Sequence, residues 1–360
     1  MKRTLALVLS LLLAMSLLAG CGEKEVSAPP EDLKIAFITD VGVVDDNGFN
    51  EDTYAGVKAF AEANGADYAY YKPADGSKEV LLDTIQKAVD EGSHIVVMAG
   101  ALFAEPCYQA AMDNPHTLFL ALAVTPDQIG TDLLPVNLSL LTHREEQAGF
   151  LAGYAAVSEG YKELGFLGGM EVEAIVHFGH GFLLGAEQAA ADQGISDVSV
   201  KYWYSGSFVP NKEIEEKMNT WYQEGTQLIF ACGGGIYESA LNAAEKQDGL
   251  LIGVDVDQSY LSKRFLFSAT KSLSRSVELA LNAAAENDLH WPQAYAGTCQ
   301  ALGAAENCIG LSMDTAEFSV FTQGDYDALM MALSQGTIVI EDPFLASQHP
   351  DCSHITVDYQ

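Results

Sequence analysis

The sequence predicts an α/β protein of two lobes, each built on a doubly wound parallel sheet. From Leu33 onward, short runs rich in β-branched and aromatic residues alternate with longer runs of helical period, which is typical of βαβ units. The alternation starts again after residue 157, so two such sets follow one another. About 330 residues follow the N-terminal leader and tether, which is more than one hydrophobic core usually holds.

The first set of units runs from residue 33 to residue 139. Apolar runs bounded by turn residues predict strands, and longer amphipathic runs, most of which end at glycine, predict helices. The predicted strands are 33–39, 67–71, 94–100, 117–123 and a short one at 133–139, and the predicted helices are 49–65, 78–92 and 105–114.

The second set opens with a predicted helix at 144–157 and repeats the same alternation. A further helix is expected before Gly336. The predicted strands are 164–169, 198–205, 228–234 and 250–255, and the predicted helices are 180–194, 211–225 and 237–247.

The N-terminus has the pattern of a bacterial lipoprotein signal. Lys2 and Arg3 precede an apolar run that is too short for a stable transmembrane helix, and small residues stand directly before Cys21. We expect residues 1–20 to be removed, Cys21 to be acylated, and residues 21–32 to be a flexible tether. The protein would then be extracytoplasmic, with a lipid anchor in the cell membrane. The alternative is an ordinary secretory signal with an incidental cysteine.

The charge of the mature chain is strongly negative. Without Lys2 and Arg3, 16 basic residues remain against 50 acidic ones, a net charge of −34. Such a field repels nucleic acids and anionic lipid headgroups. Neutral or cationic ligands are therefore favoured.

Beyond Cys21, the cysteines show no zinc-binding spacing and no C-x-x-C pair. Cys299 and Cys308 are close enough in sequence to form a disulfide, but two free thiols are an equal alternative. The five cysteines are Cys107, Cys232, Cys299, Cys308 and Cys352.

Functional residues are expected directly after strands, because ligands of open α/β sheets bind beyond the carboxyl ends of the strands. These loops do not carry a phosphate or nucleophile motif. Ile236 and Tyr237 follow the glycines at 233–235, where a P-loop needs Lys and Ser or Thr, and no G-x-S-x-G elbow is present. We therefore expect no enzyme activity and no cofactor. The loops are 40–49, 100–105, 168–170, 205–208, 233–235 and 255–257.

Two patterns give only weak indications of a metal site. Asp40, Asp45 and Asp46 offer carboxylates to a calcium ion, with a loose likeness to the opening of calcium-dependent nucleoside hydrolases. That opening needs a second aspartate, which this chain lacks. His177 and His180 have helical i, i+3 spacing, but two solvated histidines at a helix entrance are the favoured explanation. No metal site is predicted, and a hydrolase-like enzyme stays an alternative.

Two aromatic residues in loops of opposite lobes suggest that a flat ring is bound between them. Phe49 follows Gly48 at a helix entrance, and Phe208 takes the matching position in the second set. A base stacked on an aromatic ring gains about 1 to 3 kcal/mol, and a carboxylate binds sugar hydroxyls well. Each ring also has a simpler interpretation, as a hydrophobic staple that packs on its own helix. Asp45 and Asp46 likewise have a simpler interpretation, as helix caps.

Several blocks of the chain resemble the basic membrane protein family, substrate-binding lipoproteins of ABC transporters that include purine-nucleoside receptors. The likeness covers most of the mature chain, from about Lys34 to Leu273, and continues more weakly beyond. It rests on the combination of D-x-G-x-x-D-D-x-x-F-N, G-G-M-E and G-V-D-x-D-Q. The blocks are IAFITDVGVVDDNGFNEDTYAGV, GALFAEPCYQAA, EEQAGFLAGYAA, GFLGGMEVEAIVHFGHGFLLGAE, YSGSFVPNKEIE, IGVDVDQ and ATKSL.

The resemblance implies a type I periplasmic-binding-protein fold, with hinge crossovers joining lobes that close over a nucleoside. It implies that Phe49 and Phe208 stack on the base, and that Asp255 and Lys271 reach the ribose. Asp40 and Asn50 lie in the first-loop motif, and Gly233 approaches the ligand through its backbone. Glu105 stands where the family has a base-binding aspartate, and this longer side chain would alter base preference.

The resemblance also implies how the chain is divided. The N-terminal lobe is expected at 33–138 plus about 258–290, the C-terminal lobe at 139–257 plus about 291–347, and an added tail at 348–360.

The function implied is capture of a nucleoside, specifically a purine nucleoside, and its delivery to a permease and its ATPase. We expect a monomer that binds no nucleic acid and meets the membrane through its lipid. The alternatives are the calcium-dependent hydrolase and a lipoprotein sensor that binds another small sugar or base.

Overall fold

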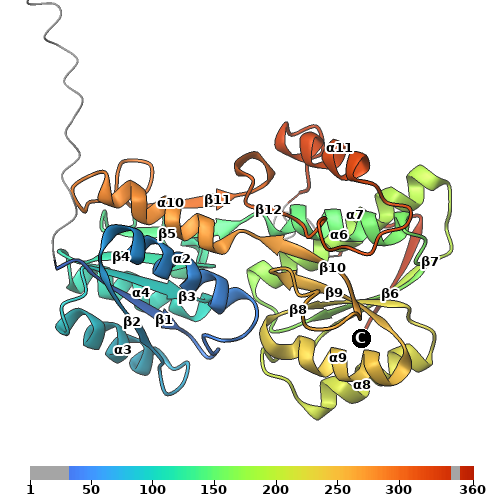
Figure 1. Ribbon diagram of the computed structural model, residues 1–360, viewed down its shortest axis with the longest axis horizontal. Helices are drawn as coiled ribbons and strands as arrows, with labels where there is room; N and C mark the ends of the chain where they lie inside the picture. Colours follow the sequence, from blue (N-terminus) through green and yellow to red (C-terminus); the bar gives the residue numbers. More distant parts are fainter. Residues whose placement is uncertain (1–31, 342–348) are drawn as a thin grey trace, which may run out of the picture.

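A computed structural model describes residues 32–341 and 349–360, in which two lobes lie side by side (Figure 1). Each lobe is a largely parallel sheet with helices on both faces, so the predicted fold class is confirmed. The predicted leader, Cys21 and nearly all of the tether lie outside the described residues. Within the described ranges, no helix has the length and apolar character needed to cross a membrane.

The first sheet has six strands, and every neighbouring pair in it is parallel. Five strands come from the first half of the chain, and the sixth, β11, arrives from much later in the sequence. In order across the sheet, the strands are β11 (Thr298–Leu302), β5 (Leu138–His143), β4 (Leu118–Leu122), β3 (Ile95–Ala99), β1 (Lys34–Thr39) and β2 (Asp67–Tyr71).

The second sheet has seven strands. All its pairs are parallel except β10 with β12, which is antiparallel. In order across the sheet, the strands are β12 (Ile309–Leu311), β10 (Phe265–Lys271), β9 (Leu250–Asp255), β8 (Leu228–Cys232), β6 (Glu163–Gly168), β7 (Val198–Tyr204) and β13 (Ile355–Tyr359).

Helices cover both faces of each sheet (Figure 1). In the first lobe, α2 (Phe49–Asn64) and α10 (Leu273–Ala285) pack on one face, with α3 (Lys78–Asp90) and α4 (Ala104–Asp113) on the other. In the second, α6 (Glu145–Ser158) and α7 (Glu173–Gln193) cover one face, with α8 (Lys212–Gln223) and α9 (Tyr237–Gln247) on the other. The remaining helices are α5 (Pro126–Ile129), α11 (Gln323–Ser334) and the short η1 (Ala101–Phe103), η2 (Gly234–Ile236) and η3 (Ala304–Glu306).

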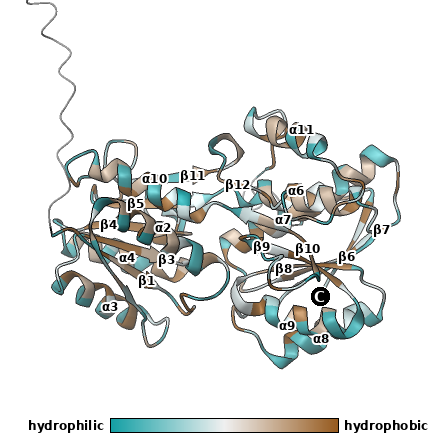
Figure 2. Ribbon diagram, in the orientation of Figure 1, coloured by the Kyte–Doolittle hydropathy of each residue, from teal (hydrophilic) through white to brown (hydrophobic). Residues whose placement is uncertain are grey.

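The hydrophobic cores explain this layering. Strands β3 and β8 are buried along their whole length, as expected for parallel strands with helices on both sides. In Figure 2 the central strands are mostly brown, whereas the outward side of α8 is largely teal. Full burial of an apolar side chain such as Phe37 or Phe230 contributes about 1.5 to 3 kcal/mol, and these cores keep the strand ends in place.

The chain crosses between the two sheets three times within the described residues. It passes from β5 to α6, from β10 to α10, and from β11 to β12. Because β10 belongs to the second sheet while α10 packs against α2, residues 258–290 are shared between the lobes rather than belonging to the first alone. The first crossing also follows His143, five residues beyond the expected boundary at 138.

The strand expected at 133–139 begins only at Leu138. Pro135 cannot donate a backbone hydrogen bond to a ladder, and the amide of Leu138 donates instead to the Pro135 carbonyl as part of a turn. The Asn137 side chain fixes this turn by donating to three carbonyls of the α4–β4 region, those of residues 111, 114 and 117. The predicted strand position was therefore wrong by about one strand length.

Two other expectations differ from the structure. Helix α7 begins at Glu173 rather than at residue 180, because the apolar segment before His180 continues the helix against α6. Part of the expected tail is β13, which adds to the second sheet beside β7. Among the described residues all five cysteines are free thiols, so Cys299 and Cys308 form no disulfide.

Candidate functional site

A cavity of about 220 Å³ lies between the lobes at the carboxyl ends of both sheets. Residues from both lobes line it, as the position of the loops predicts. Seven of the eight predicted site residues are brought together here: Asp40, Phe49, Asn50, Phe208, Gly233, Asp255 and Lys271.

Glu105 lies outside this cavity. Its carboxylate is 64% exposed and pairs with Lys78 on the surface of the first lobe. Glu105 is the second residue of α4, so the direction of the first helical turn carries its side chain away from the cavity. The position of Glu105 therefore does not support a contact with a bound base.

The Asp40 side chain, at the end of β1, is fixed by backbone amides of the loop that follows it. Its Oδ1 accepts hydrogen bonds from the amides of Val41 and Gly42, at 2.6 and 3.3 Å. Gly100 makes room for the other oxygen, because a Cβ atom at position 100 would lie 2.0 Å from Asp40 Oδ2. Burial raises the pKa of Asp40, although the two backbone hydrogen bonds oppose this.

Asp46 lies two residues before Gly48, the N-cap residue of helix α2, and its side chain caps the first amides of the helix. Its carboxylate accepts hydrogen bonds from the amides of Gly48, Asn50 and Glu51, which would otherwise be unpaired at a helix N-terminus. Burial raises its pKa despite these bonds. The cap fixes the first turn of α2 and with it the positions of Phe49 and Asn50 in the cavity.

The Asn50 side chain is oriented from one side only. Its Nδ2 donates to Asp46 Oδ2 at 3.0 Å, while its buried Oδ1 has no hydrogen-bond partner among the described residues. A buried acceptor without a donor is costly. Asn50 Oδ1 is therefore suited to accept a hydrogen bond from a bound molecule.

Glycines surround Phe208 in the second lobe. A Cβ atom at Gly169 would lie 2.6 Å from the Phe208 ring, and one at Gly234 would lie 3.2 Å from Phe208 Cβ. Gly233 has a φ of +145°, and a Cβ there would lie 2.9 Å from Gly169 Cα. These glycines therefore let the Phe208 ring pack against backbone at the cavity wall.

Lys271 connects the cavity to the hinge. Its ammonium lies 3.1 Å from Asp255 Oδ1 and 3.3 Å from Glu145 Oε1, and it is 5.0 Å from the centroid of the Phe49 ring. All three charged side chains are at least nine-tenths buried. Asp255 ends β9 with a φ of +68°, a conformation that is uncommon outside glycine.

These charges shift one another's pKa values. Burial alone would lower the pKa of Lys271, but Asp255 and Glu145 outweigh it and the pKa is raised. Burial raises the pKa of Asp255, opposed by Lys271. For Glu145, burial is outweighed by Lys271 and His177, and the pKa is lowered. Lys271 is accordingly a permanent cation beside the cavity.

Asn47 joins the two lobes across the cavity mouth. The sequence analysis did not predict this contact. Its Nδ2 donates to the Tyr237 hydroxyl at 3.0 Å, and its Oδ1 accepts from Tyr260 at 2.7 Å. Gln258 donates to the Asn47 carbonyl at 3.0 Å. Asn47 has a φ of +51°, which asparagine tolerates better than most residues. The signal available in the sequence was the Asn-Gly pair at 47–48, which is typical of a turn.

The cavity is chemically suited to a neutral ligand with an aromatic part and several hydroxyl groups. Among the described residues, two phenylalanine rings and six carboxylates line it, and the one cation, Lys271, is already paired. The first-loop aspartates do not form a three-ligand metal group among the described residues. The carboxylates are Asp40, Asp45, Asp46, Glu173, Glu238 and Asp255.

Comparison with known proteins places the chain in a family. Residues 33–331 match the family of PnrA-like ABC transporter substrate-binding proteins. The ABC transporter nucleoside-binding protein BmpA of Lactococcus lactis is 28% identical over 280 residues, covering 73% of this chain and 76% of its own. Basic membrane protein A of Borreliella burgdorferi is 27% identical over 337 residues, covering 93% and 95%.

Comparison with solved structures supports the two-lobed α/β fold. An ABC transporter solute-binding protein from Aeropyrum pernix superposes with a TM-score of 0.69 at 19% identity, covering 87% of this chain and 89% of its own. Since the family match extends over most of the chain, the resemblance inferred from sequence blocks is confirmed. The protein belongs to the PnrA-like, or basic membrane protein, family of ABC transporter substrate-binding proteins.

Proposed function

We propose that this substrate-binding protein captures a nucleoside, specifically a purine nucleoside, between its lobes and delivers it to an ABC permease without chemical change. The observation that carries the proposal is the convergence of Phe49, Phe208, Asp255 and Lys271 on one cavity from both lobes. The relative from Lactococcus lactis is described as nucleoside-binding, which supports the same ligand class.

The base would lie against the two phenylalanine rings. Phe49 and Phe208 come from opposite lobes, and each is only partly buried in its own core. Stacking on aromatic rings is worth about 1 to 3 kcal/mol per base. A two-ring purine offers more area to this contact than a pyrimidine, which is the physical reason for preferring it.

The sugar would lie toward Asp255 and Lys271. Hydroxyl groups can donate to the Asp255 carboxylate and accept from Lys271 while the ion pair persists, and charge-assisted hydrogen bonds are the stronger kind. Among the residues that the structure describes, a phosphate would meet six carboxylates and a single cation, which is already paired. The free nucleoside is therefore favoured over a nucleotide.

The position of the protein in the cell follows from the leader. We propose that Cys21 carries lipid and holds the two lobes at the outer side of the membrane, where the closed form meets a permease and its ATPase. Closure would be driven by ligand contacts that form only when both lobes are close.

The direct test is a thermal-shift screen of purified protein with purine and pyrimidine nucleosides, free bases, sugars and nucleotides. A ligand that binds only the folded state raises the melting temperature by mass action. We expect inosine, guanosine or adenosine to give the largest rise, with calorimetry confirming one site per chain. A largest rise with a sugar or free base would contradict the proposal and favour the sensor alternative.

The hydrolase alternative needs a separate measurement. Incubation with inosine and calcium, followed by chromatography for free hypoxanthine, distinguishes binding from cleavage. Intact inosine is expected. Release of base at a rate proportional to protein concentration would show an enzyme instead.

A further inference from the structure

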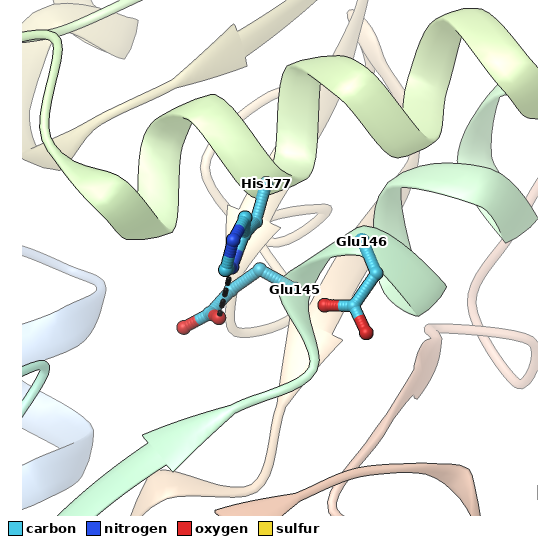
Figure 3. Close-up of side chains that lie close together, drawn as sticks. All are labelled: Glu145, Glu146 and His177. Atoms are coloured by element: carbon cyan, nitrogen blue, oxygen red, sulfur yellow. Dashed lines mark ion pairs between the residues drawn. The ribbon is translucent and has the colours of Figure 1, made fainter. Parts of the chain in front are cut away.

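A second cavity of about 220 Å³ lies beside the first, where the chain leaves β5 for α6. Three of its side chains turn toward one another (Figure 3): Glu145 and Glu146 begin α6, and His177 lies on α7. One ligand atom from each lies within 4.8 Å of the other two. This cluster is distinct from the ring-and-aspartate lining of the first cavity.

The three side chains are nearly buried. The exposed fractions are 3% for Glu145, 10% for Glu146 and 14% for His177. Two carboxylates side by side in such a place are costly unless cations compensate them. The ion pair of Glu146 with Arg144 is long, at 3.8 Å, so this carboxylate has capacity for a closer cation.

The two oxygens of Glu145 face different partners. Its Oε1 lies 3.3 Å from the Lys271 ammonium, and its Oε2 lies 4.0 Å from His177 Nδ1. A cation bound to Oε2 can therefore leave the contact between Glu145 and Lys271 in place. Glu145 therefore contacts Lys271 of the ligand cavity through one oxygen and faces the cluster through the other.

We propose that Glu145, Glu146 and His177 form a binding site for a divalent first-row transition metal ion of the Zn²⁺ or Co²⁺ class. An imidazole with two carboxylates is a donor set that such ions accept, whereas an all-oxygen set favours Ca²⁺ or Mg²⁺. The three ligand atoms lie at most 4.8 Å apart, so an ion at their centre would sit no more than roughly 2.8 Å from each, and movements under about 1 Å reach the usual 2.0 to 2.2 Å.

The cavity leaves space for the remaining coordination position. Thr125, Thr142 and Ala301 also line it, so a water molecule or a small oxygen ligand could complete a tetrahedron, as in zinc sites with three protein ligands. The residues that would bind the ion together with His177 are Glu145 and Glu146 of the neighbouring helix α6. His180, which the i, i+3 spacing suggested as the second ligand, is not part of the cluster. The proposal does not depend on which solute the first cavity takes.

The test measures Co²⁺ and Zn²⁺ binding to chelator-treated full-length protein by calorimetry and visible absorption. We expect one ion per chain, a tetrahedral Co²⁺ spectrum without a thiolate band, and no competition by Ca²⁺. Glu146→Gln and His177→Gln should each weaken binding at least about 10-fold, while Glu146→His, which keeps a donor, should retain it. Far-UV circular dichroism and melting temperature establish that each variant is folded.

The matched control is the surface pair of His354 and Glu187, joined at 2.7 Å with a single carboxylate. His354→Gln should leave metal affinity unchanged. Absence of saturable binding, a thiolate band from one of the cysteines, or equal affinity in the wild type and in both Gln variants would overturn the site. Because nucleoside binding is measured separately, failure here does not bear on the proposed transport function.

Discussion

The ammonium of Lys271 lies 3.1 Å from Oδ1 of Asp255, and both side chains are more than nine-tenths buried. Glu145, on the other side of the same ammonium, starts the helix that follows the first lobe crossing. Lys271 itself ends β10, directly before the second crossing. One cation therefore joins two of the three connecting segments and also lines the ligand cavity.

Lys271→Met should destabilise the protein by about 3 to 5 kcal/mol, because it leaves two buried carboxylates without their cation. Urea unfolding measures this loss. The surface pair Lys162–Asp197, at 2.6 Å, supplies the control, since Lys162→Met should cost less than about 1 kcal/mol. Equal losses in the two variants would show that the buried pair has no special role.

Phe49→Ala and Phe208→Ala should each weaken nucleoside binding by about 1 to 3 kcal/mol, because each removes one stacking face. Calorimetry measures the affinity. Phe49→Leu keeps most of the volume but not the flat ring, so it should lose affinity while retaining the melting temperature of the free protein. Wild-type affinity in all three variants would rule out the sandwich.

Gly100→Ala should lower both stability and ligand affinity, since the new Cβ would lie 2.0 Å from Asp40 Oδ2 at a φ of +127°. Gly130→Ala is the matched control, because Gly130 also has positive φ but its Cβ would meet nothing within 4 Å. We expect the control to lose about 1 to 2 kcal/mol from backbone strain alone. Its ligand affinity should not change, and a change as large as that of Gly100→Ala would argue against a role for Asp40.

Tyr237→Phe and Tyr260→Phe each remove one hydroxyl that reaches Asn47 across the cavity mouth. Each should weaken ligand binding by about 0.5 to 1.5 kcal/mol, the usual net value of one hydrogen bond, because the closed arrangement loses a contact between lobes. Small-angle scattering of the unliganded double variant should show a larger radius of gyration. An unchanged radius together with unchanged affinity would mean that these bonds do not favour closure.

Glu187→Gln should loosen the C-terminal strand β13. The Glu187 carboxylate accepts hydrogen bonds from the amides of Ser353, His354 and Ile355. Burial would raise its pKa, but the side chain and amide of His354 outweigh this and lower it from 4.5 to about 2. Its stabilisation is therefore complete above pH 4.5 and is lost as the pH falls toward 2.

The expected cost of Glu187→Gln is about 2 kcal/mol at pH 7, the scale of hydrogen bonds to a charged group. Urea unfolding at pH 7 and pH 3 checks this, and the difference from the wild type should be smaller at pH 3. A difference that is independent of pH would show that the charge is not what stabilises β13.

Much of the fold and cavity could be predicted because local rules determine them. Most strands and helices between residues 33 and 255 follow hydrophobic periodicity, and parallel packing forces their loops to one edge. For this reason Asp40, Phe49 and Asp255 could be expected to meet although more than 200 residues separate the first from the last. Their contact with a nucleoside stays a prediction.

The differences between the sequence-based expectations and the structure have another physical origin. The expectation for Glu105 rests on its position in a motif, which gives no information on the direction of the first turn of α4. Strand β13 pairs with β7, which lies about 150 residues earlier, and such a long-range pairing leaves no periodic signal in a five-residue segment. Asn47 and Tyr260 meet only because two lobes approach each other, which no local pattern encodes.

The three crossings between the sheets also determine which fragments of this protein could fold by themselves. Residues 33–143 alone would lack β11 and α10, leaving the edge of β5 and one face of α2 open to water, so a simple N-terminal fragment should aggregate. Neither half is a continuous stretch of chain. Producing the first lobe by itself would require deleting the intervening segment and fusing the returning one, residues 272–302, to the end of β5.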